Sequence, residues 1–368
     1  MVYRILCSHC RLGFIQSCEL GSRNYMIITS SQVIPVLKVN RSYSESKVWP
    51  MTDKQQDQIY RLKGLPIIHH HGYVCDLPPK HRFPMPKFHK VFDFLEKDGI
   101  IHRERQLIEP SQIVDDVACN VHTPEYIDKF FNGKTDEVEQ RATGFVWTAG
   151  LASRVRYETG GTLLAAQLSL ERGLACSTAG GTHHAFPDRG AGFCLINDLA
   201  IAAQQLINTQ AVSRVLIVDL DVHQGDGTAF IFRNTEAVFT FSMHCGKNFP
   251  FRKQNSDLDV PLEVGIDDNE FLSILQEHLP HILDTFRPDL VLYDAGVDPH
   301  KDDELGKLNL TDAGLFKRDE YVLNQVLKRG VPVATVIGGG YSEDIDQLAL
   351  RHTIVHRAAT RVWGSRGL

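Results

Sequence analysis

The sequence lacks a strong excess of either charge, and it lacks long apolar runs. Its 368 residues include 39 basic and 45 acidic side chains, so the formal net charge is −6. Proteins that bind nucleic acid through their overall charge carry a basic surplus, which is absent here. No apolar run approaches the length of a membrane-spanning helix. The sequence therefore predicts neither direct nucleic-acid binding nor a membrane span.

Cysteine is too sparse to hold a fold of this size together. Eight cysteines in a chain of this length do not make a disulfide scaffold. Cys7 and Cys10 form one CxxC pair, but no second pair completes a structural zinc site. We interpret these two cysteines as free thiols. The composition, with 43% hydrophobic and 23% charged residues, is that of an ordinary globular protein.

The beginning of the chain differs in composition from the rest. Its first 50 residues hold six basic side chains, two acidic ones and eight serines. An acid-poor start with serines and arginines is typical of a transit segment that directs a protein to an organelle. A poorly ordered extension without a targeting role has the same composition. Both interpretations stay open, and we predict that residues 1–56 precede a catalytic domain at 57–368.

Beyond residue 60, short apolar runs alternate with amphipathic segments. Strands are predicted at residues 65–68, 174–177, 215–218, 237–243, 290–293 and 331–337. Helices are predicted at 87–97, 123–131, 160–173, 197–207, 267–286 and 311–329, with one more at the C-terminus. This alternation predicts a single α/β domain with a mostly parallel sheet flanked by helices. In such a sheet the ligand site lies beyond the carboxyl ends of the strands.

The most informative stretch is Asp219–Thr228, which reads DLDVHQGDGT. It follows the predicted strand at 215–218 and places three carboxylates and one imidazole within eight residues. Burying isolated charges is costly, so such a cluster beside a buried strand needs partners or a metal. Asp221 and His223 are two residues apart and point to one side of an extended chain, as two metal ligands would. The alternative is a solvated acidic loop with a surface histidine.

Three other predicted strands also run into polar loops. His183 and His184 follow the strand at 174–177, Asp298 follows the strand at 290–293, and Tyr341 follows three glycines after the last strand. Taken singly, these residues could be a surface histidine pair, an acid at a helix entry and a turn tyrosine. Because the carboxyl ends of parallel strands meet at one edge, we expect the four loops to converge.

Together these residues have the chemistry for metal-assisted amide hydrolysis. Three ligands would leave a fourth position open for water or substrate, as a catalytic zinc needs: Asp221, His223 and Asp298. His184 can take a proton from that water and return it to the leaving amine. Tyr341 can donate to the developing oxyanion. Asp219 and Asp226 can accept hydrogen bonds from the outer nitrogens of the histidine pair.

Four motifs together resemble the zinc-dependent histone deacetylase family, which has the arginase–deacetylase fold. They occur in order and read GGTHHAFPDRGAGFC, DLDVHQGDGT, AGVDPHKDDELG and GGGY. The resemblance covers the chain from about Leu65 to its C-terminus. It is closest to class IV deacetylases and their plant and bacterial relatives. Gln224 stands where class I and II members carry a second histidine, and the early loop reads LPPKHRFPM.

The resemblance implies a role for each residue of these motifs. The zinc ligands would be Asp221, His223 and Asp298. The tandem histidines would be His183 and His184, with His184 as general base and acid. The carboxylates behind this pair would be Asp219 and Asp226. The tyrosine that polarises the substrate carbonyl would be Tyr341.

The resemblance further implies substrate contacts and structural potassium. Phe193 and Phe249 would flank the acyl-lysine tunnel, and Gly192 would offer a backbone contact. Arg82 would match the arginine of the internal channel through which acetate leaves. One potassium site would use chiefly backbone oxygens of Asp219, Asp221, His223, Ser242 and Met243. A second potassium site would use Phe232, Thr235 and Val238.

The predicted function is zinc-dependent hydrolysis of the amide of N-ε-acyl-lysine in a protein or peptide, whether histone or not. The alternatives are deacylation of an acetylpolyamine or another small amide, a two-metal ureohydrolase like arginase, and an inactive acyl-lysine-binding scaffold. The resemblance suggests the nucleus or cytoplasm, whereas the start of the chain indicates a mitochondrion or chloroplast. The acyl chain, the partners and the oligomeric state are not predicted.

Overall fold

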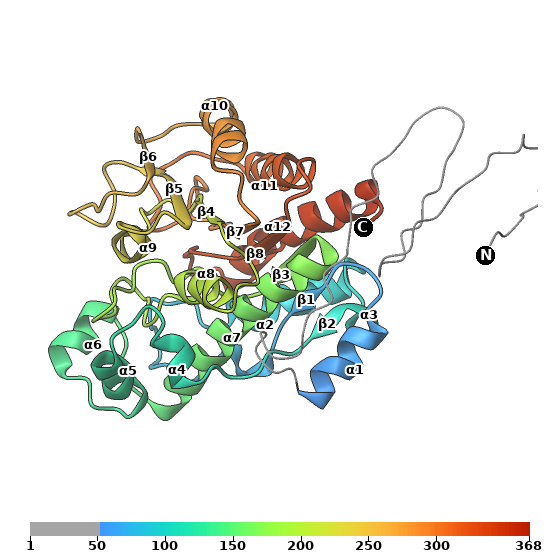
Figure 1. The fold of residues 1–368 in the computed structure, drawn as a ribbon. Coiled ribbons are helices and arrows are strands. Elements are labelled where there is room, and N and C mark those ends of the chain that lie inside the picture. Colours follow the sequence, from blue (N-terminus) through green and yellow to red (C-terminus); the bar gives the residue numbers. More distant parts are fainter. Residues whose placement is uncertain (1–51) are drawn as a thin grey trace, which may run out of the picture. The chain divides into compact units, whose positions relative to one another are not determined.

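In the computed structural model, residues 52–368 are described, and they form an α/β fold around one eight-stranded sheet (Figure 1). All strand pairs in this sheet are parallel, and their order is β2-β1-β3-β8-β7-β4-β5-β6. The strands are β1 (Ile67–Ile68), β2 (Leu107–Ile108), β3 (Leu174–Ser177), β4 (Val215–Asp219), β5 (Val238–Cys245), β6 (Leu258–Leu262), β7 (Leu290–Asp294) and β8 (Val333–Val336). The predicted fold class is confirmed.

Helices cover both faces of the sheet, as a parallel sheet requires. In Figure 1, α7 (Ala149–Arg172) and α8 (Asp198–Asn208) lie on one side, and α10 (Asp268–Phe286), α11 (Asp312–Leu327) and α12 (Ile345–Arg366) lie on the other. The long helix α12 packs against α11 and against α2 (Lys87–Lys97). The remaining helices are α1 (Asp53–Arg61), η1 (His71–Tyr73), α3 (Arg103–Gln106), α4 (Asp115–Ala118), α5 (Pro124–Phe131), α6 (Glu137–Thr143) and α9 (Asp226–Phe232).

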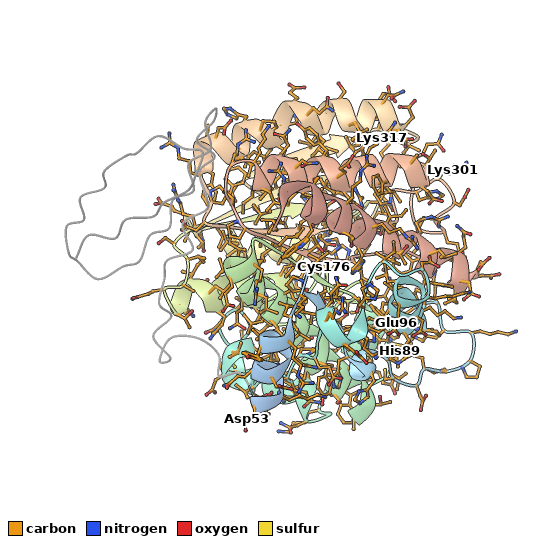
Figure 2. The ribbon with its side chains drawn as sticks, turned by 90° about the vertical axis from the view of Figure 1, so that its right-hand side faces the viewer. Asp53, His89, Glu96, Cys176, Lys301 and Lys317 are labelled. Atoms are coloured by element: carbon orange, nitrogen blue, oxygen red, sulfur yellow. The ribbon has the colours of Figure 1, made fainter. Side chains whose placement is uncertain are left out.

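The core lies between these layers. The strands β3, β4, β7 and β8 are buried along their whole lengths. Figure 2 shows the labelled Cys176 in the interior, whereas Lys301 and Lys317 lie at the periphery, in agreement with their burial. In the part of the chain that the structure describes, no helix is both long and apolar enough to cross a membrane. The five cysteines in this part are free thiols, whereas Cys7 and Cys10 lie outside it.

Most predicted elements agree with the structure to within two residues. Thr123, Asp267 and Thr311 each accept a hydrogen bond from the first turn of the helix that follows. The short strands β2 and β6 were not predicted, and neither were the shorter helices α1, η1, α3, α4, α6 and α9. Helix α1 crosses the predicted boundary at residue 56. The proposed transit segment lies almost entirely outside the described residues and stays a prediction.

One helix begins well before its predicted start. We expected a helix at 160–173 from its apolar residues, but α7 begins at Ala149 and includes Gly160 and Gly161. The glycines lie inside the helix because other groups pack closely against it. A Cβ atom on Gly160 would lie 1.9 Å from the carbonyl oxygen of Ser111, and one on Gly161 would lie 1.9 Å from the Tyr73 hydroxyl.

A buried arginine below the carboxyl ends of β4 and β7 holds the two loops that follow them. The Arg318 guanidinium donates to the carbonyl oxygens of Leu220 (3.3 Å), Ala295 (3.2 Å) and Gly296 (2.7 Å). It also donates to the Asp319 carboxylate at 2.9 Å. Arg318 is fully buried. Arg318 therefore donates hydrogen bonds to carbonyl groups that make none within the sheet. These carbonyl groups lie next to the residues predicted to bind metal.

We predict that Arg318→Met lowers the free energy of unfolding by about 3–5 kcal/mol, because it leaves Asp319 as an unpaired buried charge and the three carbonyls without a donor. Urea denaturation measures this change. The matched control is Arg361→Met, which removes an exposed arginine whose ion pair with Glu320 lies at the surface. This control is expected to cost less than about 1 kcal/mol. Equal losses in the two variants would contradict the anchoring role.

Candidate active site

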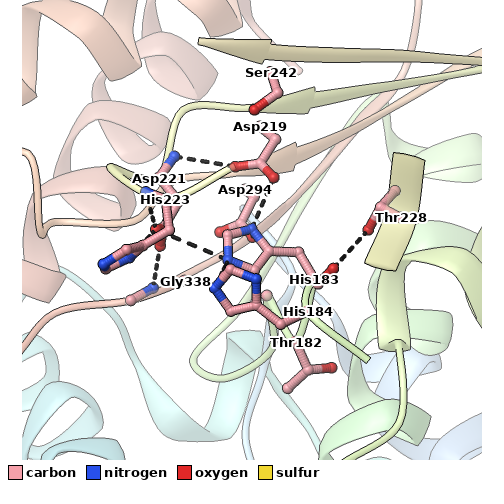
Figure 3. Close-up of polar contacts among 12 residues, drawn as sticks. Thr182, His183, His184, Asp219, Asp221, His223, Thr228, Ser242, Asp294 and Gly338 are labelled. Atoms are coloured by element: carbon pink, nitrogen blue, oxygen red, sulfur yellow. Dashed lines mark hydrogen bonds and ion pairs between the residues drawn. The ribbon is translucent and has the colours of Figure 1, made fainter. Parts of the chain in front are cut away.

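The loops after β3, β4, β7 and β8 converge at one edge of the sheet, as the parallel topology predicts (Figure 3). Asp219 at the end of β4 lies opposite Asp294 of β7 and Ser242 of β5 in the strand register. Figure 3 shows His183 and His184 between this strand end and the segment that carries Asp221 and His223. The sheet thus brings together side chains that lie more than 100 residues apart in the sequence.

The predicted metal ligands form one compact cluster. Asp221, His223 and Asp298 are buried, and each offers an atom within 4.8 Å of the others. His223 Nδ1 lies 3.0 Å from Asp221 Oδ1 and 3.1 Å from Asp298 Oδ2. Backbone amides orient the carboxylates: Gly339 donates to Asp221 at 2.7 Å, and Val222 donates to Asp298 at 2.8 Å.

The electrostatics of this cluster fit a divalent cation. Burial and the neighbouring Asp221 raise the pKa of Asp298 to about 7. Burial alone would lower the pKa of His223, but hydrogen bonds to the two carboxylates raise it to about 10. The three groups therefore concentrate negative charge that a cation at their centre would neutralise. One imidazole and two carboxylates are a donor set that suits zinc with a position left open.

A hydrogen-bonded histidine pair lies beside this cluster. His183 Nδ1 lies 2.8 Å from Asp219 Oδ2, and His184 Nδ1 lies 2.7 Å from Asp226 Oδ1. The two Nε2 atoms are 3.1 Å apart. Burial and the neighbouring His183 lower the pKa of His184 to about 4. Burial opposes protonation of His183 too, but Asp219 and Asp221 raise its pKa well above the usual value. His184 is thus the neutral member, able to accept a proton.

Tyr341 follows a tight glycine turn and lines the same cavity. A Cβ atom on Gly339 would lie 2.2 Å from an Asp298 oxygen, so only glycine lets the turn approach the cluster. Burial raises the pKa of the Tyr341 phenol well above its usual value, so the hydroxyl keeps its proton and can donate it in a hydrogen bond. The carboxylate of Asp303 accepts from the Tyr341 amide at 2.7 Å. The tyrosine is therefore fixed through its own backbone.

These groups surround one narrow cavity. Gly192 and Phe193 line it, and Phe249 lies beside it, with its ring 4.8 Å from that of His184. The ring of Phe193 lies 5.7 Å from that of Tyr341. Of the residues predicted to contact the substrate, the structure thus brings Gly192, Phe193 and Phe249 to the catalytic groups.

Arg82 does not lie in this cavity, which corrects the expectation that it lines an internal channel. In the extended segment at 81–83, alternate side chains face opposite sides. His81 and Phe83 face inward, and their rings lie 6.3 Å and 5.6 Å from that of Phe193, so the Arg82 side chain is exposed. The cations that line the cavity are instead Lys87 and Arg154.

The residues predicted to bind potassium lie near β5. Ser242 and Met243 lie in the strand itself, and Ser242 Oγ lies 2.9 Å from His244 Nδ1. Phe232 ends α9, and Val238 begins β5, with Thr235 between them. The potassium sites stay predictions.

Sequence reasoning missed four buried ionisable groups near the site, Lys87, Arg154, Glu158 and Asp294, and the half-buried Asp303. Asp294 could have been found, because it ends its strand as Asp219 ends β4. Both of its carboxylate oxygens lack a hydrogen-bond partner among the described residues. Burial and the neighbouring Asp219 raise its pKa well above the usual value. Lys87 and Arg154 gave no signal, since both lie in helices where such residues normally face solvent.

Fold and site together define an α/β enzyme with a candidate metal centre at the carboxyl edge of a parallel sheet. Comparison with known proteins narrows this class: residues 81–356 match the histone deacetylase domain. The chain belongs to the histone deacetylase family, whose members include named deacetylases, and this membership supports a hydrolase. The comparison does not separate class IV from the other classes, so that part of the resemblance stays a prediction.

Two relatives and one solved structure illustrate this membership. An uncharacterized protein of Picosynechococcus is 52% identical over 301 residues, covering 82% of this chain and 100% of its own. Histone deacetylase 2 of Arabidopsis thaliana is 32% identical over 270 residues, covering 71% of this chain and 70% of its own. The crystal structure of the HDA15 HD domain superposes with a TM-score of 0.67 at 21% identity, covering 82% of this chain and 88% of that one. At this identity, the structural match shows the fold alone.

We predict that Asp298→Asn weakens metal binding by more than about 10-fold, because removing a ligand charge costs more than altering an outer hydrogen bond to a ligand. Metal content after equilibration with limiting zinc and a chelator measures this loss. Asp302→Asn is the matched control, since Asp302 lies in the same loop, is exposed and is not part of the cluster. Full retention of metal by Asp298→Asn would refute the ligand assignment.

We also predict that Asp303→Asn slows turnover, because an amide cannot accept all three backbone hydrogen bonds that the carboxylate accepts from Leu305, Gly306 and Tyr341. A displaced Tyr341 can cost up to about 100-fold in kcat. Metal content and the unfolding midpoint are expected to change little. If Asp303 acts only through the tyrosine, its replacement has no further effect in a Tyr341→Phe background. An equal effect in both backgrounds would contradict the positioning role.

Proposed function

We propose that the chain is a zinc-dependent amidohydrolase that removes an acyl group from the ε-amine of lysine in a protein or peptide. The observation that carries this proposal is the meeting of three elements around one cavity: the Asp221–His223–Asp298 cluster, the histidine pair and Tyr341. Membership of the histone deacetylase family supports an acetylated substrate. Family membership alone does not identify the acyl group or the protein substrate.

Zinc bound at Asp221, His223 and Asp298 would polarise the substrate carbonyl and acidify a water. His184 Nε2 takes the proton from the attacking water and later delivers it to the leaving lysine amine. Asp226 fixes the tautomer of His184, and the charged His183, paired with Asp219, stabilises negative charge nearby. The Tyr341 hydroxyl donates to the oxygen that gains charge as water attacks.

The access route suits a lysine side chain. The ring of Phe249 packs against His184 and that of Phe193 against Tyr341, and a Cβ atom on Gly192 would lie 3.0 Å from the Phe249 ring. Two aromatic walls can enclose the methylene stem of a lysine and leave its amide at the catalytic groups. The backbone of Gly192 then offers a polar contact at this point.

A two-metal ureohydrolase is the alternative that the structure lets us weigh most directly. A second group of buried donors does exist, formed by His183, Asp219 and Asp294. However, His183 Nδ1 already lies at hydrogen-bond distance from Asp219, and the raised pKa of Asp294 favours its neutral form over a charged ligand. We therefore expect one zinc per chain. Potassium at the residues named around β5 and targeting by residues 1–56 remain further proposals.

We predict that the zinc-loaded protein releases acetate from an N-ε-acetyl-lysine peptide with a higher kcat/KM than from acetylspermidine. The peptide arm tests the protein substrate, and the polyamine arm tests the small-molecule alternative. A faster reaction with acetylspermidine would move the assignment to that alternative. If neither compound reacts, the inactive acyl-lysine-binding scaffold is the remaining alternative. Binding of the peptide without turnover would identify it.

Replacement of the tyrosine tests the mechanism itself. Tyr341→Phe is expected to lower kcat by about 100- to 1,000-fold, the usual cost of losing one donor to the oxyanion. Zinc content and peptide binding measured by fluorescence polarisation are expected to stay unchanged, which separates a catalytic loss from misfolding. Unchanged turnover would mean that Tyr341 does not serve the oxyanion.

A further inference from the structure

The wall of the cavity behind the candidate metal centre carries charges that the proposed mechanism does not use. Lys87, Arg154 and Glu158 line it together with the catalytic residues. All three side chains are at least 96% buried. Enclosing the methyl of a bound acetyl group gives these charges no role, because a methyl group is best enclosed by apolar atoms.

Arg154 and Glu158 satisfy each other. The two terminal nitrogens of the arginine donate to the two carboxylate oxygens, each at 2.8 Å. The remaining nitrogen, Nε, donates to the carbonyl oxygen of Tyr73 at 2.9 Å. This bidentate pair is complete and has no net charge, so neither residue needs a ligand.

Lys87 has no such partner. Its Nζ makes only two long contacts, at 3.4 Å each, to the carbonyl oxygens of Gly338 and Gly340. Aromatic rings surround it, including that of Tyr341, whose centroid lies 5.9 Å away. In residues 52–368, no carboxylate lies within ion-pair distance of this nitrogen. The nearest acidic groups, Asp221, Asp298 and Asp303, are already used by the metal cluster or by backbone amides.

The ammonium of Lys87 nevertheless persists at neutral pH. Burial lowers its pKa to about 8, opposed by attraction to Asp298 and Asp303. A buried cation without a counter-ion is costly, and the cost is recovered when an anion binds beside it. When zinc neutralises Asp221 and Asp298, their attraction for Lys87 weakens, so Lys87 needs another anion nearby to keep its proton. An anionic group in the cavity is therefore the missing partner.

The position of Lys87 defines where this anion would lie. The turn at 338–340 contacts the metal cluster on one side, through the Gly339 amide and Asp221 at 2.7 Å. On the other side, its carbonyls contact Lys87. The ammonium thus lies one peptide turn beyond the candidate metal ligands. In a succinyl group, the distal carboxylate carbon lies three bonds, or about 3.9 Å, beyond the amide carbonyl carbon.

We propose, building on the proposed function, that this protein hydrolyses lysine amides whose acyl group ends in a carboxylate, of the malonyl to glutaryl class, with Lys87 as the group that binds this carboxylate. The reaction remains an amide hydrolysis that consumes one water. The C–N bond breaks, a C–O bond forms, and the lysine amine leaves with the proton. For a succinylated lysine, the second product is succinate instead of acetate.

The test compares acyl groups on one lysine peptide with the zinc-loaded protein. Succinyl is compared with 4-methylpentanoyl, which has nearly the same shape but no charge, and acetyl serves as the reference. We expect kcat/KM for succinyl to exceed that for 4-methylpentanoyl by about 10-fold or more, the usual gain from a hydrogen bond to a charged group. The ratio of the two rates cancels any general loss of activity in a variant.

Variants of α2 assign this preference to Lys87. Lys87→Met is expected to reduce the ratio to about 1 or below, and Lys87→Arg is expected to keep it above 1, since charge is retained. Lys90→Met is the matched control, because Lys90 lies one turn further along the same helix, is exposed and pairs with Asp346. This control is expected to leave the ratio unchanged. Melting curves and zinc content establish that each variant is folded.

The outcomes separate this inference from the proposed function. Hydrolysis of the acetyl peptide with a wild-type ratio of 1 or less would overturn the carboxylate preference and leave the deacylase intact. If Lys87→Met alters only inhibition by added acetate and not the ratio, Lys87 serves the acetate product and the inference is wrong. Absence of hydrolysis for all three peptides would overturn the proposed function itself.

Discussion

The burial of several carboxyl groups at the carboxyl ends of β4 and β7 is the constraint on which the rest of this structure depends. Asp219, Asp221, Asp294 and Asp298 are all at least 97% buried. Their mutual repulsion would be prohibitive if all were charged and unpaired. Each is instead stabilised differently: Asp219 by His183, Asp294 by a raised pKa that favours its neutral form, and Asp221 and Asp298 by His223 and the cation that their geometry fits.

The surrounding backbone is shaped to serve these groups. Amides of Val222 and Gly339 hold the two ligand carboxylates, and Arg318 holds the carbonyls that precede them. These donors act on the same two loops from opposite sides. A loop fixed at both its amides and its carbonyls cannot rotate its peptides freely, so the ligand side chains keep their positions. The metal ligands are thus held in place before substrate binds by groups that make no contact with substrate.

Much of the fold and most of the central site could be predicted from the sequence, for an identifiable reason. Buried strands consist of continuous apolar runs, and each of the informative strands leads into a loop that carries its polar residue. The topology then fixes that those ends meet. Prediction failed where placement depended on tertiary packing. Gly160 and Gly161 lie inside α7 because of groups on other segments, and Arg82 faces solvent because its neighbour Phe83 fills the interior. The burial of Lys87 follows from the packing of α2 against α12, which no local pattern encodes.

The glycine turn at 338–340 links chemistry and substrate choice in one element. Its Gly339 amide donates to Asp221, and its Gly338 and Gly340 carbonyls accept from Lys87. The turn is followed directly by Tyr341. A group bound at Lys87 would therefore contact the turn that positions the oxyanion donor and a metal ligand. Interactions made only when such a group is in place could orient Tyr341 for the transition state, so binding energy from the end of the acyl chain would appear in kcat and not only in KM. An acyl group too short to reach Lys87 would forgo this contribution. In this arrangement, acyl-chain specificity and the rate of the chemical step depend on the same turn.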